Sequence, residues 1–99
     1  MIVANWNIRG VNQPYKQREV SSLVHKHMIT IMGLIETKVH EAQHQRIIQT
    51  MLPGWIFLTN YICHPNGRIW VLWNPSLVSI KSLSITDQVI HVEALFLQN

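Results

Sequence analysis

Two polar residues whose chemistry suits a divalent cation stand at the ends of two apolar runs. Asn7 closes residues 2–7, and Glu36 directly follows residues 29–35. If these runs form neighbouring parallel strands, both side chains emerge at the same edge of the sheet, where open α/β sheets bind their ligands. Carboxylate and amide oxygens are the ligands that Mg²⁺ prefers. The spacing therefore predicts a shared metal-binding position for Asn7 and Glu36.

The composition is that of one small globular domain with weak charge. The chain has 99 residues, 47% of them hydrophobic, which limits it to a single core. Its net charge is +3 and only 13% of the residues are charged, so a polyanionic partner is permitted but not required. The lone Cys63 excludes an internal disulfide and a cysteine-based zinc ribbon. We expect no membrane span, because no apolar stretch reaches about 18 residues, and no signal peptide, because residues 1–5 have neither a basic flank nor a small-residue cleavage site.

The first third of the chain has the pattern of a strand–helix–strand unit. Residues 2–7 read as a strand, and a helix begins at Pro14, since proline is tolerated in a first turn. The apolar residues of that helix fall on one stripe: Val20, Leu23, Val24 and Met28. Residues 29–35 lack polar alternation, which is typical of a strand covered on both faces. A right-handed crossover therefore makes the two strands parallel.

The remainder predicts a second helix followed by strands. Residues 40–51 are helical in pattern, with His44, Ile47, Ile48 and Met51 on one side. Strand-like runs follow at 55–59, 68–73, 77–83 and 88–97, separated by turn residues at 64–67, 74–76 and 86–87. We expect these runs to form an antiparallel meander. In the last run, Ile90, Val92, Ala94 and Phe96 face one way, as in a half-buried strand.

Several of these segments, in this order and spacing, resemble the endonuclease/exonuclease/phosphatase superfamily with its DNase I-like fold. The likeness is greatest to the endonucleases of plant non-LTR (LINE-type) retrotransposons. It is carried by Trp-Asn-Ile-Arg-Gly at 6–10, Lys-Gln-Arg-Glu-Val at 16–20, Gly-Leu-Ile-Glu-Thr-Lys at 33–38, Gly-Arg-Ile-Trp-Val-Leu-Trp-Asn-Pro at 67–75 and Gln-Val-Ile-His at 88–91. The fold that this resemblance implies is an α/β (α+β) truncated DNase I-like sandwich, a βαβα unit followed by an antiparallel β meander. Residues 1–99 would be the N-terminal portion of one such domain.

The resemblance implies an activity and assigns residues to it. The family hydrolyses DNA phosphodiester bonds with Mg²⁺, for which Mn²⁺ is a possible substitute, and it would make Glu36 the metal ligand. Asn7 would orient the metal's water shell or the phosphate, so both residues count as catalytic. Arg9 and Lys38 would contact phosphate, Lys38 on the same face as Glu36 if the strand continues. A family member of this kind would act in the nucleus.

The family's later motifs are missing from this sequence. It contains no Asp-x-Asn and no Asp-His, and its only aspartate is Asp87 in a predicted turn. Positioning and charge stabilisation supply most of phosphoryl-transfer catalysis, so only an inherited metal half-site is expected here. We therefore predict a remnant endonuclease that is inactive alone and binds DNA weakly through electrostatics. A partial sandwich would also leave the apolar face of the strands between Trp70 and Leu95 uncovered, which favours self-association.

Two alternatives stay open. The chain can be a non-catalytic nucleic-acid-binding or interaction fragment. Residues 40–44, His-Glu-Ala-Gln-His, match the zinc-peptidase pattern in which His40 and His44 bind zinc and Glu41 is the base. Nothing in the sequence supplies the third ligand, although His64 and His91 are candidates, and polar residues surround the pair. The tryptophans at 55, 70 and 73 are expected in the core rather than stacked on bases.

Overall fold

A parallel strand pair joined by a helix opens the fold. The computed structural model describes residues 1–65 and 68–97. Strand β1 spans Ile2–Asn7, helix α1 spans Pro14–His27 and strand β2 spans Ile29–Ile35, with β1 and β2 paired in parallel. Pro14 lies in the first turn of α1, as predicted, and the helix ends where Met28 adopts a left-handed conformation, φ 54°. The predicted crossover unit is thus confirmed.

Over the described residues, the second half adds one helix and four strands. Helix α2 spans Glu41–Met51, and the strands are β3 (Ile56–Thr59), β4 (Ile69–Trp73), β5 (Val78–Ile85) and β6 (Ile90–Phe96). β4 pairs antiparallel with both β2 and β3, which gives the four-stranded order β1-β2-β4-β3. β5 and β6 form a separate two-stranded antiparallel sheet. The fold is therefore mixed α/β, with the predicted strands in two sheets.

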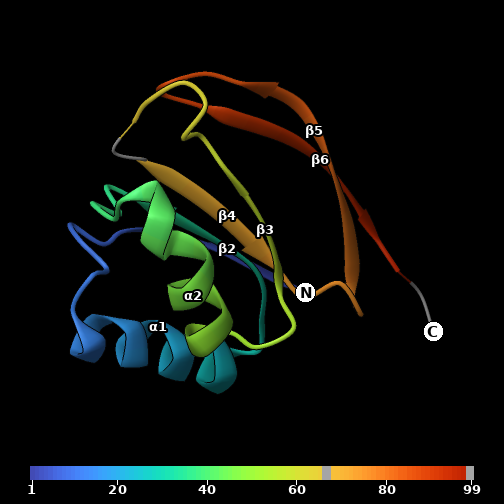
Figure 1. Ribbon diagram of the computed structural model, residues 1–99. Helices are drawn as coiled ribbons and strands as arrows, with labels where there is room; N and C mark the ends of the chain where they lie inside the picture. Colours follow the sequence, from blue (N-terminus) through green and yellow to red (C-terminus); the bar gives the residue numbers. More distant parts are fainter. Residues whose placement is uncertain (66–67, 98–99) are drawn as a thin grey trace.

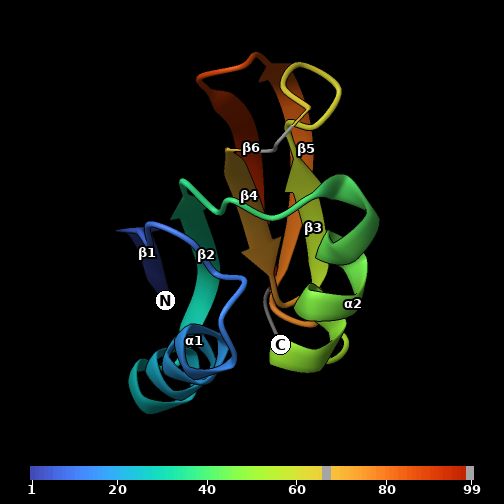
Figure 2. The same cartoon turned by 60° about the vertical axis from the view of Figure 1, so that its left-hand side comes forward.

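The elements stack in three layers. Figure 1 shows α1 and α2 against one face of the four-stranded sheet and the β5–β6 hairpin over the other face. Figure 2 shows β1 at one edge of the sheet, beside β2 and away from β5 and β6. The central strands β2 and β4 thus lie between two layers, as the absence of polar alternation in β2 predicted.

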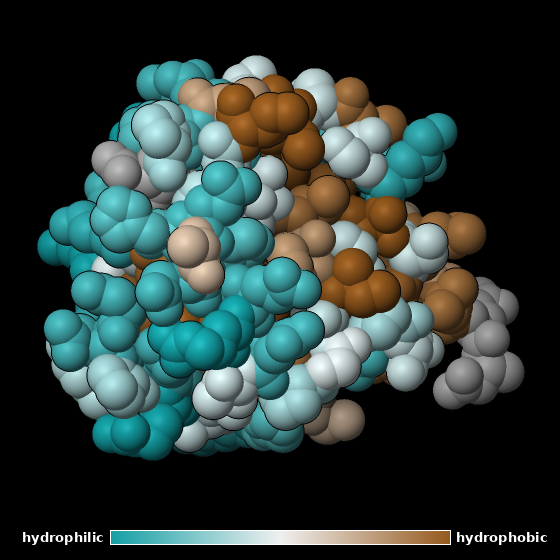
Figure 3. All heavy atoms as spheres, in the orientation of Figure 1, coloured by the Kyte–Doolittle hydropathy of each residue, from teal (hydrophilic) through white to brown (hydrophobic). Residues whose placement is uncertain are grey.

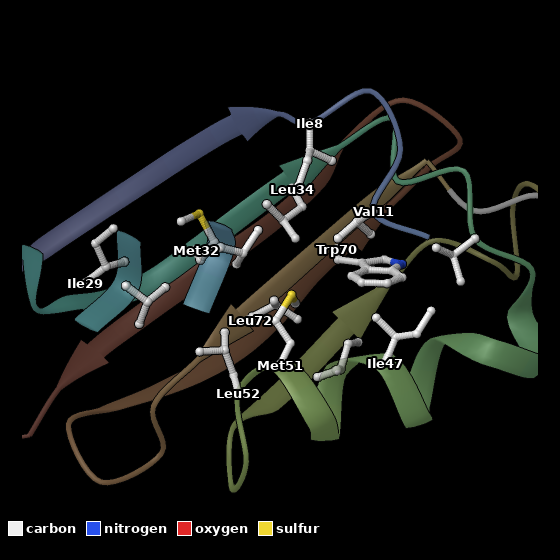
Figure 4. Packing of buried hydrophobic residues seen from close by; sticks show 14 of the residues in the cluster. Ile8, Val11, Ile29, Met32, Leu34, Ile47, Met51, Leu52, Trp70 and Leu72 are labelled. Carbon is white, nitrogen blue, oxygen red and sulfur yellow. The ribbon is translucent and has the colours of Figure 1, made fainter. Parts of the chain in front are cut away.

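The larger core lies between the helices and the sheet. Trp70 and Leu72 of β4 face the helices together with Met32 and Leu34 of β2, and all four are fully buried (Figure 4). Ile47, Ile48 and Met51 of α2 close the other side of this core. The predicted apolar side of α2 is therefore confirmed. In α1, Val20 and Val24 are buried and Leu23 is half-buried.

A smaller core joins the two sheets. Ile31, Trp73 and Val78 are its buried members, and partly buried residues of β3 to β6 pack against them: Leu58, Val71, Ile80 and Ala94. Trp70 and Trp73 are buried, and Trp55 is half-buried, as expected for core tryptophans. On β6 the residues from Ile90 to Ala94 alternate between half-buried and exposed, as predicted for a half-buried strand, but Phe96, predicted on the same side as Ile90, is exposed.

Two expectations about the strands and α1 are wrong. β4 and β5 do not pair, so the four late strands form two antiparallel pairs in different sheets rather than one meander. The chain leaves the first sheet at the turn after Trp73, where the Leu77 amide donates to the Asn74 carbonyl at 3.1 Å. Met28 does not join the α1 stripe, because it follows the helix and its side chain is 80% exposed. Asn66 and Gly67 of the predicted turn at 64–67, and Gln98 and Asn99 after the last strand, lie outside the described residues.

Apolar surface is concentrated on the sheet side of the molecule. In Figure 3 the brown side chains gather toward the region of β5 and β6, whereas the helix side is mostly teal. Leu95 is 68% exposed, and Leu83, Phe96 and Leu97 are also exposed. Of the helices described, none is long and apolar enough to cross a membrane.

Candidate functional site

The segments that follow β1 and β2 continue side by side beyond the strands. Asn7 is the register partner of Ile35, so Glu36 is one residue further along the neighbouring strand. The Ile8 amide then donates to the Ile35 carbonyl at 3.0 Å, and the Gly10 amide to the Glu36 carbonyl at 2.7 Å. The two predicted metal-side residues therefore leave the sheet at the same edge, on hydrogen-bonded segments.

Buried side chains anchor both segments on the helix side of the sheet. Ile8 and Val11 hold the first segment, and Thr37 and Val39 hold the second, all essentially inaccessible to solvent. Between these anchors the polar residues alternate outward: Arg9 and Lys38 are exposed and Glu36 is half-buried. This alternation keeps charged groups at the surface while the backbone beneath them is fixed by packing.

Three of the four predicted site residues have left-handed backbone. The φ angles are 54° at Arg9, 58° at Glu36 and 55° at Lys38. For a residue with a Cβ this region costs about 1–2 kcal/mol. Such conformations persist where the surroundings impose them, and they are concentrated at functional sites. Their clustering on two adjacent loops is the feature that most sets this edge apart from the rest of the fold.

Gly10 brings the two loops into close approach. Its φ is +104°, and an added Cβ would stand 3.4 Å from Asn12 Oδ1 and 3.8 Å from Lys38 Cδ. The aliphatic part of Lys38 therefore lies over the β1 loop. Strand β2 ends at Ile35, as predicted, and the chain then turns through two left-handed residues, so the continuing strand that would place Lys38 on the same face as Glu36 is not present. Lys38 reaches the neighbouring loop by that turn rather than by strand alternation.

Two side chains at the start of α1 form hydrogen bonds with the loop that follows β1. Lys16 Nζ donates to the Ile8 carbonyl at 2.5 Å, and Gln17 Nε2 donates to the Val11 carbonyl at 3.0 Å. Both side chains bond loop carbonyls that the sheet leaves free. Residues 16–20 belong to the segments that carry the family resemblance, but no role was predicted for Lys16 or Gln17. They are positioning residues, and their place one turn inside a helix that follows the loop was the available signal.

Asn60, directly after β3, and Arg68, directly before β4, support the loop that follows β2. The Glu36 amide donates to the Arg68 carbonyl at 2.7 Å, which puts Arg68 next to Glu36 in the fold. Buried Asn60 accepts from the amides of Arg68 and Ile69, both at 3.0 Å, and donates to the carbonyls at 86 and 87. It ties β4 to the β5–β6 turn. The sequence analysis missed both residues, since their contacts are long-range.

The charged side chains around Glu36 favour binding of an anion, together with a cation that keeps most of its water ligands. Arg9, Lys38 and Arg68 are exposed cations on segments that adjoin Glu36. No group of three or more His, Cys, Asp or Glu side chains that could hold a metal occurs within residues 1–65 and 68–97. One carboxylate and one amide fit Mg²⁺, which keeps several of its waters and commonly takes one or two carboxylates from the protein. They do not fit a fully protein-ligated ion.

The two histidines of the zinc-peptidase pattern have different environments. His40 is exposed before the first turn of α2, whereas the His44 ring packs 4.8 Å from the Tyr61 ring and 5.4 Å from the Phe57 ring, centroid to centroid. His44 Nδ1 donates to the Glu41 carbonyl. His44 therefore serves in aromatic packing, and the part of the chain that is described supplies no third ligand near the pair.

Tyr61 links that aromatic packing to the β2 loop. Its hydroxyl donates to the Val39 carbonyl at 2.6 Å and accepts from Trp70 Nε1 at 3.2 Å. Burial raises the pKa of Tyr61 above its usual value of 10.0. Because Val39 follows Lys38 directly, this hydrogen-bond chain fixes the end of the site loop to the core.

Comparison with known proteins adds no relative. No protein-family model matches this chain, and no curated protein is significantly similar to it.

Proposed function

We propose that this chain carries the N-terminal half-site of a Mg²⁺-dependent DNA endonuclease on a partial DNase I-like sandwich. The observation that carries the proposal is the left-handed backbone of Arg9, Glu36 and Lys38 on two hydrogen-bonded loops at one sheet edge. Strained non-glycine residues are costly, and a purely structural loop would be better served by glycine. The polar types found there are those that phosphate and a hard cation require.

Each residue has a definite part in this proposal. Glu36 would hold the cation through its carboxylate, and Asn7 would orient a water of the cation or a phosphate oxygen through its amide. A bound Mg²⁺ supplies neutralisation of phosphoryl charge. Arg9 and Lys38 would bind non-bridging phosphate oxygens, for which guanidinium and ammonium groups are suited.

The fold supports the proposal in a general way. A parallel β–α–β unit, helices on one face and a second sheet on the other are what a DNase I-like sandwich would present in its first part. The exposed apolar residues of β5 and β6, such as Leu95, agree with a sheet that has further cover in a complete domain or in a self-associated form.

Catalysis by the chain alone is expected to be negligible. Nothing in the 99 residues corresponds to the family's Asp-x-Asn or Asp-His motifs, so no group is available to position the nucleophile or to stabilise the leaving oxygen. With supercoiled plasmid and Mg²⁺ we expect no nicking above that of buffer. Nicking that Glu36→Gln abolishes would instead identify a complete small nuclease.

Metal binding tests the proposal directly. In a Mg²⁺ titration followed by amide NMR shifts, we expect saturable changes near Asn7 and Glu36 in the wild type and their loss in Glu36→Gln. Glu41→Gln is the matched control, because it removes the same charge from an exposed position on α2. Identical titrations in the wild type and Glu36→Gln would rule the half-site out.

The second candidate function is non-catalytic binding of nucleic acid at the same edge. Three exposed cations, Arg9, Lys38 and Arg68, stand near a single carboxylate, which favours a polyanion even without a metal. DNA affinity that falls steeply with salt and is indifferent to Mg²⁺ and to Glu36→Gln would support this function over the first.

A further inference from the structure

A groove lies between the edge strand β1 and helix α1. It is separate from the site at the strand ends, where Asn7 and Glu36 lie. It encloses about 530 Å³ and is lined by aromatic, charged and apolar side chains of both elements. Trp6 of β1 and Leu23 of α1 are its half-buried members, and Tyr15 at the start of α1 is 52% exposed. β1 is the edge strand of the four-stranded sheet, with β2 as its neighbour (Figure 2), and no further strand of the described residues pairs with its outer side.

The groove is lined by more cations than carboxylates. Arg18 and Lys26 line it from α1, and within residues 1–65 and 68–97 neither side chain has a hydrogen bond or an ion pair. Glu19 is the one carboxylate among the lining residues, so cations outnumber it. A ligand complementary to this lining is anionic.

The aromatic groups narrow the ligand class further. An indole and a phenol beside unpaired cations are the combination with which proteins bind single-stranded nucleic acid, where bases stack on rings and cations follow the phosphates. Arg18 and Lys26 are eight residues apart on the helix, about 12 Å along its axis, which spans three to four stacked nucleotides at about 3.4 Å each. A duplex keeps its base faces stacked inside and offers these rings nothing to stack on.

We propose that the groove between β1 and α1 binds a single-stranded nucleic-acid segment, with Trp6 and Tyr15 stacking on bases and Arg18 and Lys26 contacting phosphates. This site needs no divalent cation and uses neither Asn7 nor Glu36. Helix α1 begins near the C-terminal end of β1 and runs back along it. A nucleic-acid strand in the groove would therefore extend away from the candidate half-site, toward the N-terminal end of β1.

The test is binding of a fluorescein-labelled oligothymidine in EDTA at low ionic strength, followed by fluorescence anisotropy. The double variant Arg18→Gln/Lys26→Gln is expected to bind about tenfold more weakly than the wild type. The matched control, Arg46→Gln/Lys81→Gln, removes two exposed charges that do not line the groove and should change the affinity less than about twofold. Equal losses in both double variants would overturn the proposal in favour of unspecific attraction.

A second pair of measurements tests the stacking. Tyr15→Ala alters a largely exposed side chain, so it should fold normally and still bind at least about fivefold more weakly. On titration with the oligonucleotide, the indole N–H signal of Trp6 should shift while that of buried Trp70 does not. A Trp6 signal that is unmoved, an unchanged affinity of Tyr15→Ala, or equal affinity for duplex DNA would each refute the assignment.

Two controls separate the possible sources of failure. Arg9→Gln/Lys38→Gln removes two exposed cations beside the half-site; if it weakens oligothymidine binding in EDTA as much as Arg18→Gln/Lys26→Gln does, the groove is not a separate site and the proposal is overturned. A shift of the Trp6 signal that depends on protein concentration alone would show that a second copy of the chain occupies the groove, and would likewise overturn the proposal.

Discussion

Replacing Glu36 by glycine should stabilise the fold while it removes the proposed metal ligand. Glu36 has φ 58°, and its backbone amide and carbonyl are both hydrogen-bonded, to Arg68 and Gly10. Glycine keeps those bonds and removes the left-handed penalty of about 1–2 kcal/mol. It also loses more conformational entropy on folding, about 0.5–1 kcal/mol. The net expectation for Glu36→Gly is a gain of about 0.5–1 kcal/mol in the free energy of unfolding.

Urea unfolding followed by tryptophan fluorescence measures this gain. With a slope of about 2 kcal/mol per molar urea, the midpoint should rise by about 0.3–0.5 M. Met28→Gly serves as a matched control outside the site, since Met28 is exposed and also left-handed, φ 54°, after the last turn of α1. It should stabilise by a similar amount. Gln45→Gly, in the middle of α2, should instead destabilise by about 1 kcal/mol.

The pattern across the three variants decides the reasoning. If Glu36→Gly lowers the midpoint as Gln45→Gly does, the loop backbone is not strained, and the argument from strain to function fails. If Glu36→Gly raises the midpoint but Mg²⁺ still binds as in the wild type, the strain is real and the carboxylate is not a ligand. Only a stabilised chain with lost metal binding agrees with the whole account.

Three further outcomes follow from the hydrogen bonds that support the site. Asn60→Ala should lower the free energy of unfolding by about 2–4 kcal/mol in the same urea assay, since four partly buried hydrogen bonds lose their partner, whereas Asn12→Ala at an exposed position should be nearly neutral. Lys16→Met should broaden the loop amide NMR signals and weaken Mg²⁺ binding with little change in global stability; unaltered loop signals would contradict its positioning role. Because burial raises the pKa of Tyr61 in the folded state, the unfolded chain loses that proton first, so stability should fall as the pH rises above about 10. Tyr61→Phe should flatten this alkaline decline, and an equally steep decline in the variant would refute it.

The local elements were predictable because their patterns are local. The strands 2–7 and 29–35 have the predicted bounds and the first helix begins at Pro14 as predicted, because periodicity and the positions of Pro and Gly depend only on near neighbours. Parallel pairing of the first two strands followed from the helix between them, since a strand–helix–strand crossover brings the chain back to run in the same direction. The same edge for Asn7 and Glu36 was therefore foreseeable from the sequence.

What failed was the arrangement of the late strands. Residues 69–73 are all apolar. Their side chains alternate between the two faces of the sheet, so that Trp70 and Leu72 face the helices and Trp73 faces β5. The rule that identified β2 as covered on both faces applies to this run as well, and it would have placed a second layer over β4 instead of extending a single meander.

The supports of the site were beyond sequence reasoning for a physical reason. Asn60 contacts residues 8 to 27 positions away, and Tyr61 reaches Val39 across 22 positions, so neither contact leaves a periodic signal. The left-handed φ angles at Glu36 and Lys38 were equally hidden, because such angles are ordinarily marked by glycine or asparagine.

Paramagnetic broadening by Mn²⁺ tests the central claim most directly, since a bound Mn²⁺ broadens the amide signals nearest to it. At low Mn²⁺ the account predicts selective loss of the signals around Asn7, Ile8 and Glu36, and their recovery in Glu36→Gln but not in Glu41→Gln. Broadening centred on His40, or a uniform loss of signal that Glu36→Gln does not alter, would contradict a shared cation position for Asn7 and Glu36.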